Sequence, residues 1–72
     1  QSAPYIELGN LYHNKNMLKE AETMLKKALE MTPDNPRIYS ELGGLYHNMN
    51  NFQKAEQMYK KALELDPNII LN

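Results

Sequence analysis

The amino-acid sequence predicts an all-α fold of about four helices, organised as two copies of a helix-turn-helix unit. The strongest observation is an internal repeat: residues 2–35 align with residues 36–69 without a gap, and 18 of the 34 positions are identical. Within each copy, apolar residues recur three and four positions apart, which is the spacing of one helical face. Asparagine and proline stand between these segments, where helices usually end or begin.

The first copy, residues 2–35, reads as two helices. The first is expected over about 4–15, with an apolar and aromatic stripe that the turn-prone "NKN" at 14–16 brings to an end. The second is expected over about 18–31, because small and apolar residues line one face and charged residues fill the opposite arc. The stripe of the first helix is Tyr5, Leu8, Gly9 and Tyr12, and that of the second is Leu18, Ala21, Leu25, Ala28 and Leu29.

The second copy, residues 36–69, follows the same plan with helices over about 36–49 and 52–65. The segment "TPDNP" at 32–36 separates the copies. Proline disfavours a helical residue before it, and Asn35-Pro36 offers an N-cap followed by a proline at the first helical position. Pro67 ends the last helix, and residues 70–72 are expected to be the truncated start of a further helix, so that the chain is a piece of a longer array.

Composition excludes several classes of function. The chain of 72 residues has no cysteine, so it contains no disulfide and no thiolate metal site. Eight basic and nine acidic residues are interspersed, which leaves no basic patch for nucleic acid or an anionic membrane. No apolar run approaches the roughly 20 residues that cross a bilayer, and no signal peptide is recognised. We expect a cytoplasmic protein without a membrane or nucleic-acid partner.

The repeated residues resemble those of the tetratricopeptide repeat family, whose period is also 34. The family shows a large aromatic, Leu-Gly and Tyr on its helix A, and then small, aromatic or apolar, and small residues and a proline on helix B. Tyr here replaces the commoner Trp at the first position. The matching positions are Tyr5, Leu8, Gly9, Tyr12, Ala21, Leu25, Ala28 and Pro33 in the first copy, and Tyr39, Leu42, Gly43, Tyr46, Ala55, Tyr59, Ala62 and Pro67 in the second.

The resemblance implies that the repeats stack as a short right-handed α-solenoid, with helix A of each repeat lining a concave groove. It also implies a non-catalytic module that binds a peptide segment of a partner protein in this groove. The side chains expected to contact the ligand are Ile6, Asn10, His13 and Asn14 in the first repeat, and Arg37, Ser40, Gly44, His47 and Asn48 in the second. The alternative is a scaffold that homo-oligomerises through its uncapped repeat ends, because each repeat needs a neighbour to cover its apolar flank.

Some members of the family grip the acidic tails of chaperones with a carboxylate clamp of lysine and asparagine on helix A. Carried over, the clamp positions fall on Ile6, Asn10, Ser40 and Gly44. Only Asn10 matches, so a chaperone-tail clamp is not expected in these two repeats.

The duplicated His13 and His47 raise the alternatives of a shared metal ion and of pH-dependent binding. A metal site on a helix usually has a second ligand three or four residues away, and neither histidine has a carboxylate or a histidine at those offsets. Ser40 and His47 are seven residues apart, about 10 Å along a helix, which is too far for a nucleophile and its base. We expect no metal, no cofactor and no catalytic residue.

The small residues of helix B predict a close approach between the two helices of each repeat. Replacing Ala28 or Ala62 with leucine is expected to overpack this contact and to lower the free energy of unfolding by about 1–3 kcal/mol. Urea denaturation followed by circular dichroism measures the change. Variants as stable as the original chain would show that these alanines do not lie at a close contact.

Overall fold

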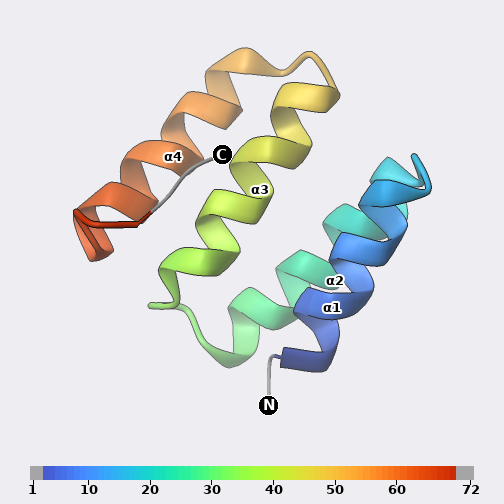
Figure 1. Ribbon diagram of the computed structural model, residues 1–72, viewed down its shortest axis with the longest axis horizontal. Coiled ribbons are helices and arrows are strands. Elements are labelled where there is room, and N and C mark those ends of the chain that lie inside the picture. The colour runs from blue at the N-terminus through green and yellow to red at the C-terminus, as the bar shows by residue number, and fades with distance from the viewer. Residues whose placement is uncertain (1–2, 70–72) are drawn as a thin grey trace.

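The computed structural model describes residues 3–69, and within this range it contains four α-helices and no strand. The helices are α1 (Ala3–Asn14), α2 (Leu18–Met31), α3 (Pro36–Asn48) and α4 (Phe52–Leu65). They form two helical hairpins, α1 with α2 and α3 with α4, and the hairpins pack side by side (Figure 1). The predicted all-α repeat fold is confirmed. The predicted start of a further helix at 70–72 lies outside the described residues.

The turn inside each hairpin has the same geometry in both repeats, and an asparagine makes it possible. Asn16 and Asn50 both have a φ of 63°, the left-handed conformation that asparagine tolerates better than most residues. The N–H of Met17 donates to the carbonyl of Tyr12 at 2.8 Å, and the N–H of Asn51 donates to that of Tyr46 at 2.9 Å. These bonds close the ends of α1 and α3 in a Schellman-type motif.

The connection between the repeats ends one helix and starts the next within a few residues. The backbone N–H of Thr32 bonds to the carbonyl of Ala28, which closes α2 immediately before a proline. The side-chain oxygen of Asn35 accepts from the N–H of Arg37 at 3.0 Å, and Pro36 occupies the first turn of α3. Asn35 therefore caps α3 as the sequence indicates.

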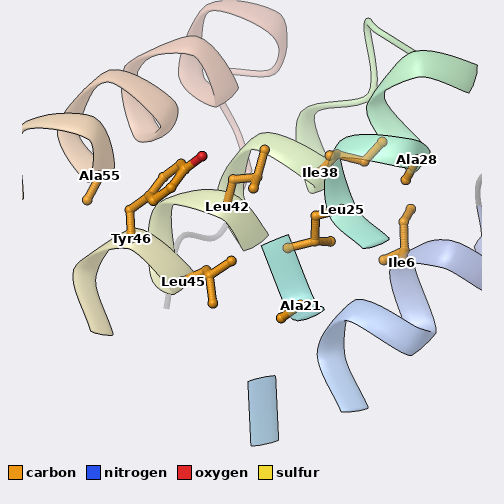
Figure 2. Close-up of a cluster of buried hydrophobic side chains, with 9 residues drawn as sticks. All are labelled: Ile6, Ala21, Leu25, Ala28, Ile38, Leu42, Leu45, Tyr46 and Ala55. Carbon is orange, nitrogen blue, oxygen red and sulfur yellow. The ribbon is translucent and has the colours of Figure 1, made fainter. Parts of the chain in front are cut away.

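The core is centred on the contact between α2 and α3. The largest fully buried side chains are Leu25 on α2 and Ile38, Leu42 and Leu45 on α3. Figure 2 shows these side chains in one cluster with small residues of the neighbouring helices. Burying one such side chain stabilises the fold by roughly 1.5–3 kcal/mol, so this contact holds the two repeats together.

Two glycines allow the helices of each hairpin to approach closely. A Cβ atom on Gly9 would lie 2.8 Å from Cγ of Leu25, and one on Gly43 would lie 2.6 Å from the ring of Tyr59. Both distances are too short for carbon atoms in contact. The adjacent Gly44 is different, since its nearest neighbour would be the Tyr59 hydroxyl at 3.6 Å.

The prediction that Leu8 belongs to the packed stripe of the first helix is wrong. Leu8 is 39% exposed and Leu11 is 49% exposed, whereas their repeat equivalents Leu42 and Leu45 are 2% and 0% exposed. The reason is position in the array, because α2 packs against α3 on that side and no described helix occupies the corresponding place beside α1.

A hydrogen bond joins α2 to α3 within the packed contact between the repeats. The hydroxyl of Tyr46 on α3 donates to the carboxylate of Glu22 on α2 at 2.7 Å, and the ammonium of Lys26 lies 3.3 Å from the same carboxylate oxygen. The Tyr46 hydrogen bond is the main cause that lowers the pKa of Glu22. Burial, followed by the Glu22 carboxylate, raises the pKa of Tyr46. The bond thus favours ionised Glu22 and neutral Tyr46.

The neighbouring glycines give a matched pair of variants. Gly44→Ala is expected to stabilise the protein by about 0.5–1 kcal/mol, because alanine is the better residue inside a helix. Gly43→Ala makes the same gain but displaces the Tyr59 ring, and overpacking of about 1–3 kcal/mol is expected to leave it the less stable variant. Thermal unfolding of both variants measures the difference. Equal stability would contradict the close approach at Gly43.

The Tyr46–Glu22 bond predicts a pH-dependent stability difference. Tyr46→Phe leaves the half-buried carboxylate without its donor and is expected to cost about 1–2 kcal/mol at pH 7. A lowered Glu22 pKa stabilises the folded state above the ordinary value of 4.5, and this contribution is lost as the pH falls below it. A raised Tyr46 pKa stabilises the folded state below the ordinary value of 10, and this contribution is lost as the pH rises above it.

The difference in unfolding free energy between the original chain and Tyr46→Phe should therefore be largest between these two values and shrink on both sides. Urea denaturation across the pH range measures it. Tyr12→Phe is the matched control at the equivalent position of the first repeat, since the described residues offer the Tyr12 hydroxyl no hydrogen-bond partner. A pH-independent difference would mean that the bond does not form in solution.

Candidate functional site

A row of polar side chains connects α1 to α3 across the boundary between the repeats. Its members, which we call the polar row, are Glu7, Asn10 and His13 on α1 and Arg37, Glu41 and Asn48 on α3. The three residues on α1 are three positions apart and those on α3 are four and seven positions apart, spacings that place each set on one side of its helix. The row therefore joins two segments that are about 30 residues apart in the sequence.

Arg37 lies between two carboxylates at one end of the polar row. Its Nη2 atom is 3.5 Å from Oε2 of Glu7, and its Nε atom is 3.9 Å from Oε2 of Glu41. The amide of Asn10 donates to the same Glu41 carboxylate at 3.4 Å. At the other end, the amide nitrogen of Asn48 lies 2.5 Å from Nε2 of His13. Side chains from both repeats thus meet at each end of the row.

These polar contacts are weak enough to be exchanged for contacts with a ligand. The side chain of Arg37 is 51% exposed and that of Glu7 is 67% exposed. Ion pairs in such surroundings contribute only about 0–1 kcal/mol, because water competes for both partners. The row carries two carboxylates and one guanidinium, so its net charge is negative when His13 is neutral. It can offer hydrogen bonds and a negative field without a large cost to the fold.

The two histidines have different surroundings. His13 contacts Asn48 in the polar row, whereas His47 lies edge-on to Phe52 of α4, with ring centroids 5.2 Å apart and an interplanar angle of 68°. Within residues 3–69 no group of three or more histidine, aspartate or glutamate side chains is arranged to hold a metal ion. The two copies of the histidine therefore have separate environments.

The other predicted contact residues are only partly brought together. Asn14 is exposed at the end of α1, and the hydroxyl of Ser40 donates to the carbonyl of Arg37 at 3.0 Å. The bond of Ser40 keeps its hydroxyl on the backbone of its own helix. Gly44 lies one turn further along α3, beside the Tyr59 hydroxyl. Of the predicted set, Asn10, His13, Arg37 and Asn48 contribute directly to the polar row.

The expected exposure of Ile6 is wrong. Its side chain is 3% exposed and belongs to the core cluster with Ala28, Leu25 and Ile38 (Figure 2). The reason is that the second hairpin packs against the first and covers this side of α1. A buried isoleucine cannot contact a ligand on the surface, so Ile6 is not part of the site.

Sequence reasoning missed Glu7 and Glu41, although a signal for them was present. They are identical in the two repeats and stand 34 positions apart. Glu41 is also four residues after Arg37, a spacing at which opposite charges pair on a helix. What the sequence does not contain is the angle between the repeats, which brings Glu7 to Arg37.

Comparison with known proteins agrees with this architecture. A family model for the tetratricopeptide repeat matches residues 15–69, which is more than half of the chain. The chain belongs to the tetratricopeptide repeat family. Tetratricopeptide repeats generally mediate protein–protein interactions and are typically not catalytic. A search of curated proteins finds no match to this chain.

No helix in the described part of this tetratricopeptide repeat pair is long and apolar enough to cross a membrane.

Proposed function

We propose that these two tetratricopeptide repeats form a non-catalytic module that binds a peptide segment of a partner protein along the polar row. The observation that carries the proposal is the exposed Arg37, held between Glu7 of one repeat and Glu41 of the other. A ligand that replaces these contacts would touch both repeats at once. Such a surface suits an extended or helical segment better than a compact small molecule.

The charges of the polar row indicate the chemistry of the segment. Two carboxylates around one guanidinium favour ligand groups that donate hydrogen bonds, such as lysine, arginine or amide side chains. Asn10 and Asn48 add groups that can both donate and accept, which suits the backbone of an extended peptide. An acidic peptide would meet repulsion from Glu7, whose side chain is largely exposed.

The arrangement also supports a binding role over a catalytic one. The Ser40 hydroxyl is engaged with a backbone carbonyl of its own helix, and His47 lies against Phe52. A nucleophile and its base need to be within hydrogen-bond reach of each other, and these two groups have other partners.

Selection from a random peptide library, followed by titration of the selected peptides, tests the proposal. Glu7→Gln removes the exposed carboxylate of the polar row and keeps a side chain that forms hydrogen bonds. The dissociation constant is expected to rise about threefold or more, which is the size of change expected when one charged contact at the surface is lost. Glu30→Gln, on the exposed arc of α2, makes the same change in net charge and is the matched control, expected to bind as the original chain does.

Backbone amide chemical shifts in a titration with the selected peptide locate the contact independently. The largest changes are expected on α1 and α3, and small changes on α2 and α4. Both variants should keep the original melting temperature within a few degrees, because exposed ion pairs contribute little to stability. Equal affinity of the two variants, together with shifts confined to α2 and α4, would place the ligand elsewhere and overturn the proposal.

A further inference from the structure

The guanidinium of Arg37 lies between two carboxylates that belong to the repeated pattern, although Arg37 itself does not. Glu7 and Glu41, which we call the carboxylate pair, stand at equivalent positions of the two repeats, 34 residues apart. The residue equivalent to Arg37 in the first repeat is Ala3. Of the eight basic residues in the sequence, Arg37 alone is an arginine. The repeat thus supplies the carboxylate pair, and the second repeat adds a single guanidinium to it.

The contacts of Arg37 with the carboxylate pair are longer than those of a well-paired guanidinium. A guanidinium that approaches a carboxylate freely forms parallel hydrogen bonds of about 2.7–2.9 Å. Arg37 instead reaches Glu7 with one nitrogen at 3.5 Å and Glu41 with another at 3.9 Å. Arg37 and Glu41 are attached to the same helix, one turn apart, and this restricts how they approach each other. A guanidinium on a separate chain has no such restriction.

Each carboxylate also has an oxygen that Arg37 does not use. The contacts of Arg37, and that of the Asn10 amide with Glu41 at 3.4 Å, all involve Oε2 atoms. Within the described residues 3–69, Oε1 of neither glutamate takes part in a hydrogen bond or an ion pair. The side chain of Glu41 is only 25% exposed, so water screens a contact with it less than one with Glu7. The carboxylate pair therefore has acceptors for a guanidinium from solution.

Arg37 can leave the carboxylate pair at little cost to the fold. Its side chain is 51% exposed, and ion pairs in such surroundings contribute little to stability. Arg37 also lies in the first turn of α3, where the partial positive charge of the helix end disfavours a cation. The cap of the helix does not depend on the guanidinium, because the Asn35 side chain bonds to the backbone N–H of Arg37.

We propose that an arginine side chain of the bound segment takes the place of the Arg37 guanidinium at the carboxylate pair, so that Arg37 acts as a competitor built into the site. The inference rests on the peptide binding proposed above and names the side chain that the site selects. While Arg37 occupies the pair, only part of the population is ready to bind, and the apparent affinity for the ligand is lowered by that fraction.

Arginine fits this position better than lysine does. The guanidinium is a planar fork with five donors, and Arg37 shows that two of its nitrogens face two different carboxylates. The lysine ammonium is a compact, strongly hydrated charge that lacks this fork. The site should therefore distinguish the two cations, and not only attract positive charge.

Titrations with three small probes test the selectivity: N-acetylarginine amide, N-acetyllysine amide and N-acetylcitrulline amide, which keeps the shape of arginine without its charge. The arginine probe is expected to shift amide signals of α1 and α3 and to bind about threefold or more tightly than either of the others. Because the sequence has one arginine, its side-chain Nε–H signal reports the displacement of Arg37 directly. Equal binding of the lysine probe, or an Nε–H signal that does not move, would overturn the proposal.

Arg37→Gln removes the competitor and is expected to bind the arginine probe about two- to fivefold more tightly than the original chain does, a factor that matches the loss of an exposed ion pair. Lys27→Gln on the exposed arc of α2 makes the same change in net charge and should leave the affinity unchanged. Melting temperatures near the original value show that both variants are folded. Equal affinities of the two variants would contradict the competitor role of Arg37.

The peptides from the library selection separate this inference from the peptide binding on which it rests. Peptides that shift α1 and α3 and lose affinity when arginine is replaced by lysine support both. Peptides that bind there without arginine overturn the competitor role and leave peptide binding intact. Peptides that shift only α2 and α4 overturn both.

Discussion

The packing of α2 against α3 is the interaction on which the rest of the structure depends. The side chains of Leu25, Ile38, Leu42 and Leu45 are fully buried in the core around this contact. A chain of this size has little surplus stability, so losing this contact would remove much of what holds the second hairpin to the first. The two repeats are therefore expected to fold as one cooperative unit, as nearest-neighbour coupling in repeat proteins requires.

The Tyr46–Glu22 hydrogen bond restricts the orientation of α3 on α2 within that apolar contact. Apolar side chains tolerate small rotations of one helix on another, whereas a buried hydroxyl reaches its carboxylate in one arrangement only. Fixing α3 on α2 also fixes α3 relative to α1, because α1 and α2 form one hairpin. The distance between Arg37 and Glu7 in the polar row thus depends on how α3 packs on α2, a contact that includes the Tyr46–Glu22 bond.

Much of the fold could be predicted from the sequence, because each repeat carries its own local signals. The 34-residue period, the asparagines at the turns and the small residues at the close contacts all follow from local physical chemistry. The family and the all-α fold are confirmed on this basis. The residues that bind a ligand remain a prediction, since only the arrangement of their side chains is known.

The errors at Ile6 and Leu8 show where local signals end. Successive helical residues are about 100° apart, so these two side chains lie on opposite flanks of the stripe centred on Tyr5 and Gly9. The flank of Ile6 is covered by the following hairpin, and the flank of Leu8 is the one that a preceding helix covers in the second repeat. Sequence periodicity identifies the centre of the buried stripe. How far the buried surface extends on each flank depends on which helices pack there, and the sequence of one repeat does not show this.

Of the adjacent glycines Gly43 and Gly44, the packing of the helices requires the first but not the second. Gly43 has no room for a side chain, whereas Gly44 has space and stands at the position that Asn10 occupies in the first repeat. An evolving or engineered chain can therefore install a new side chain at this position without disturbing the helix pair. At Gly44 the second repeat can thus accept a different side chain beside the proposed binding surface without a change in the packing of its helices.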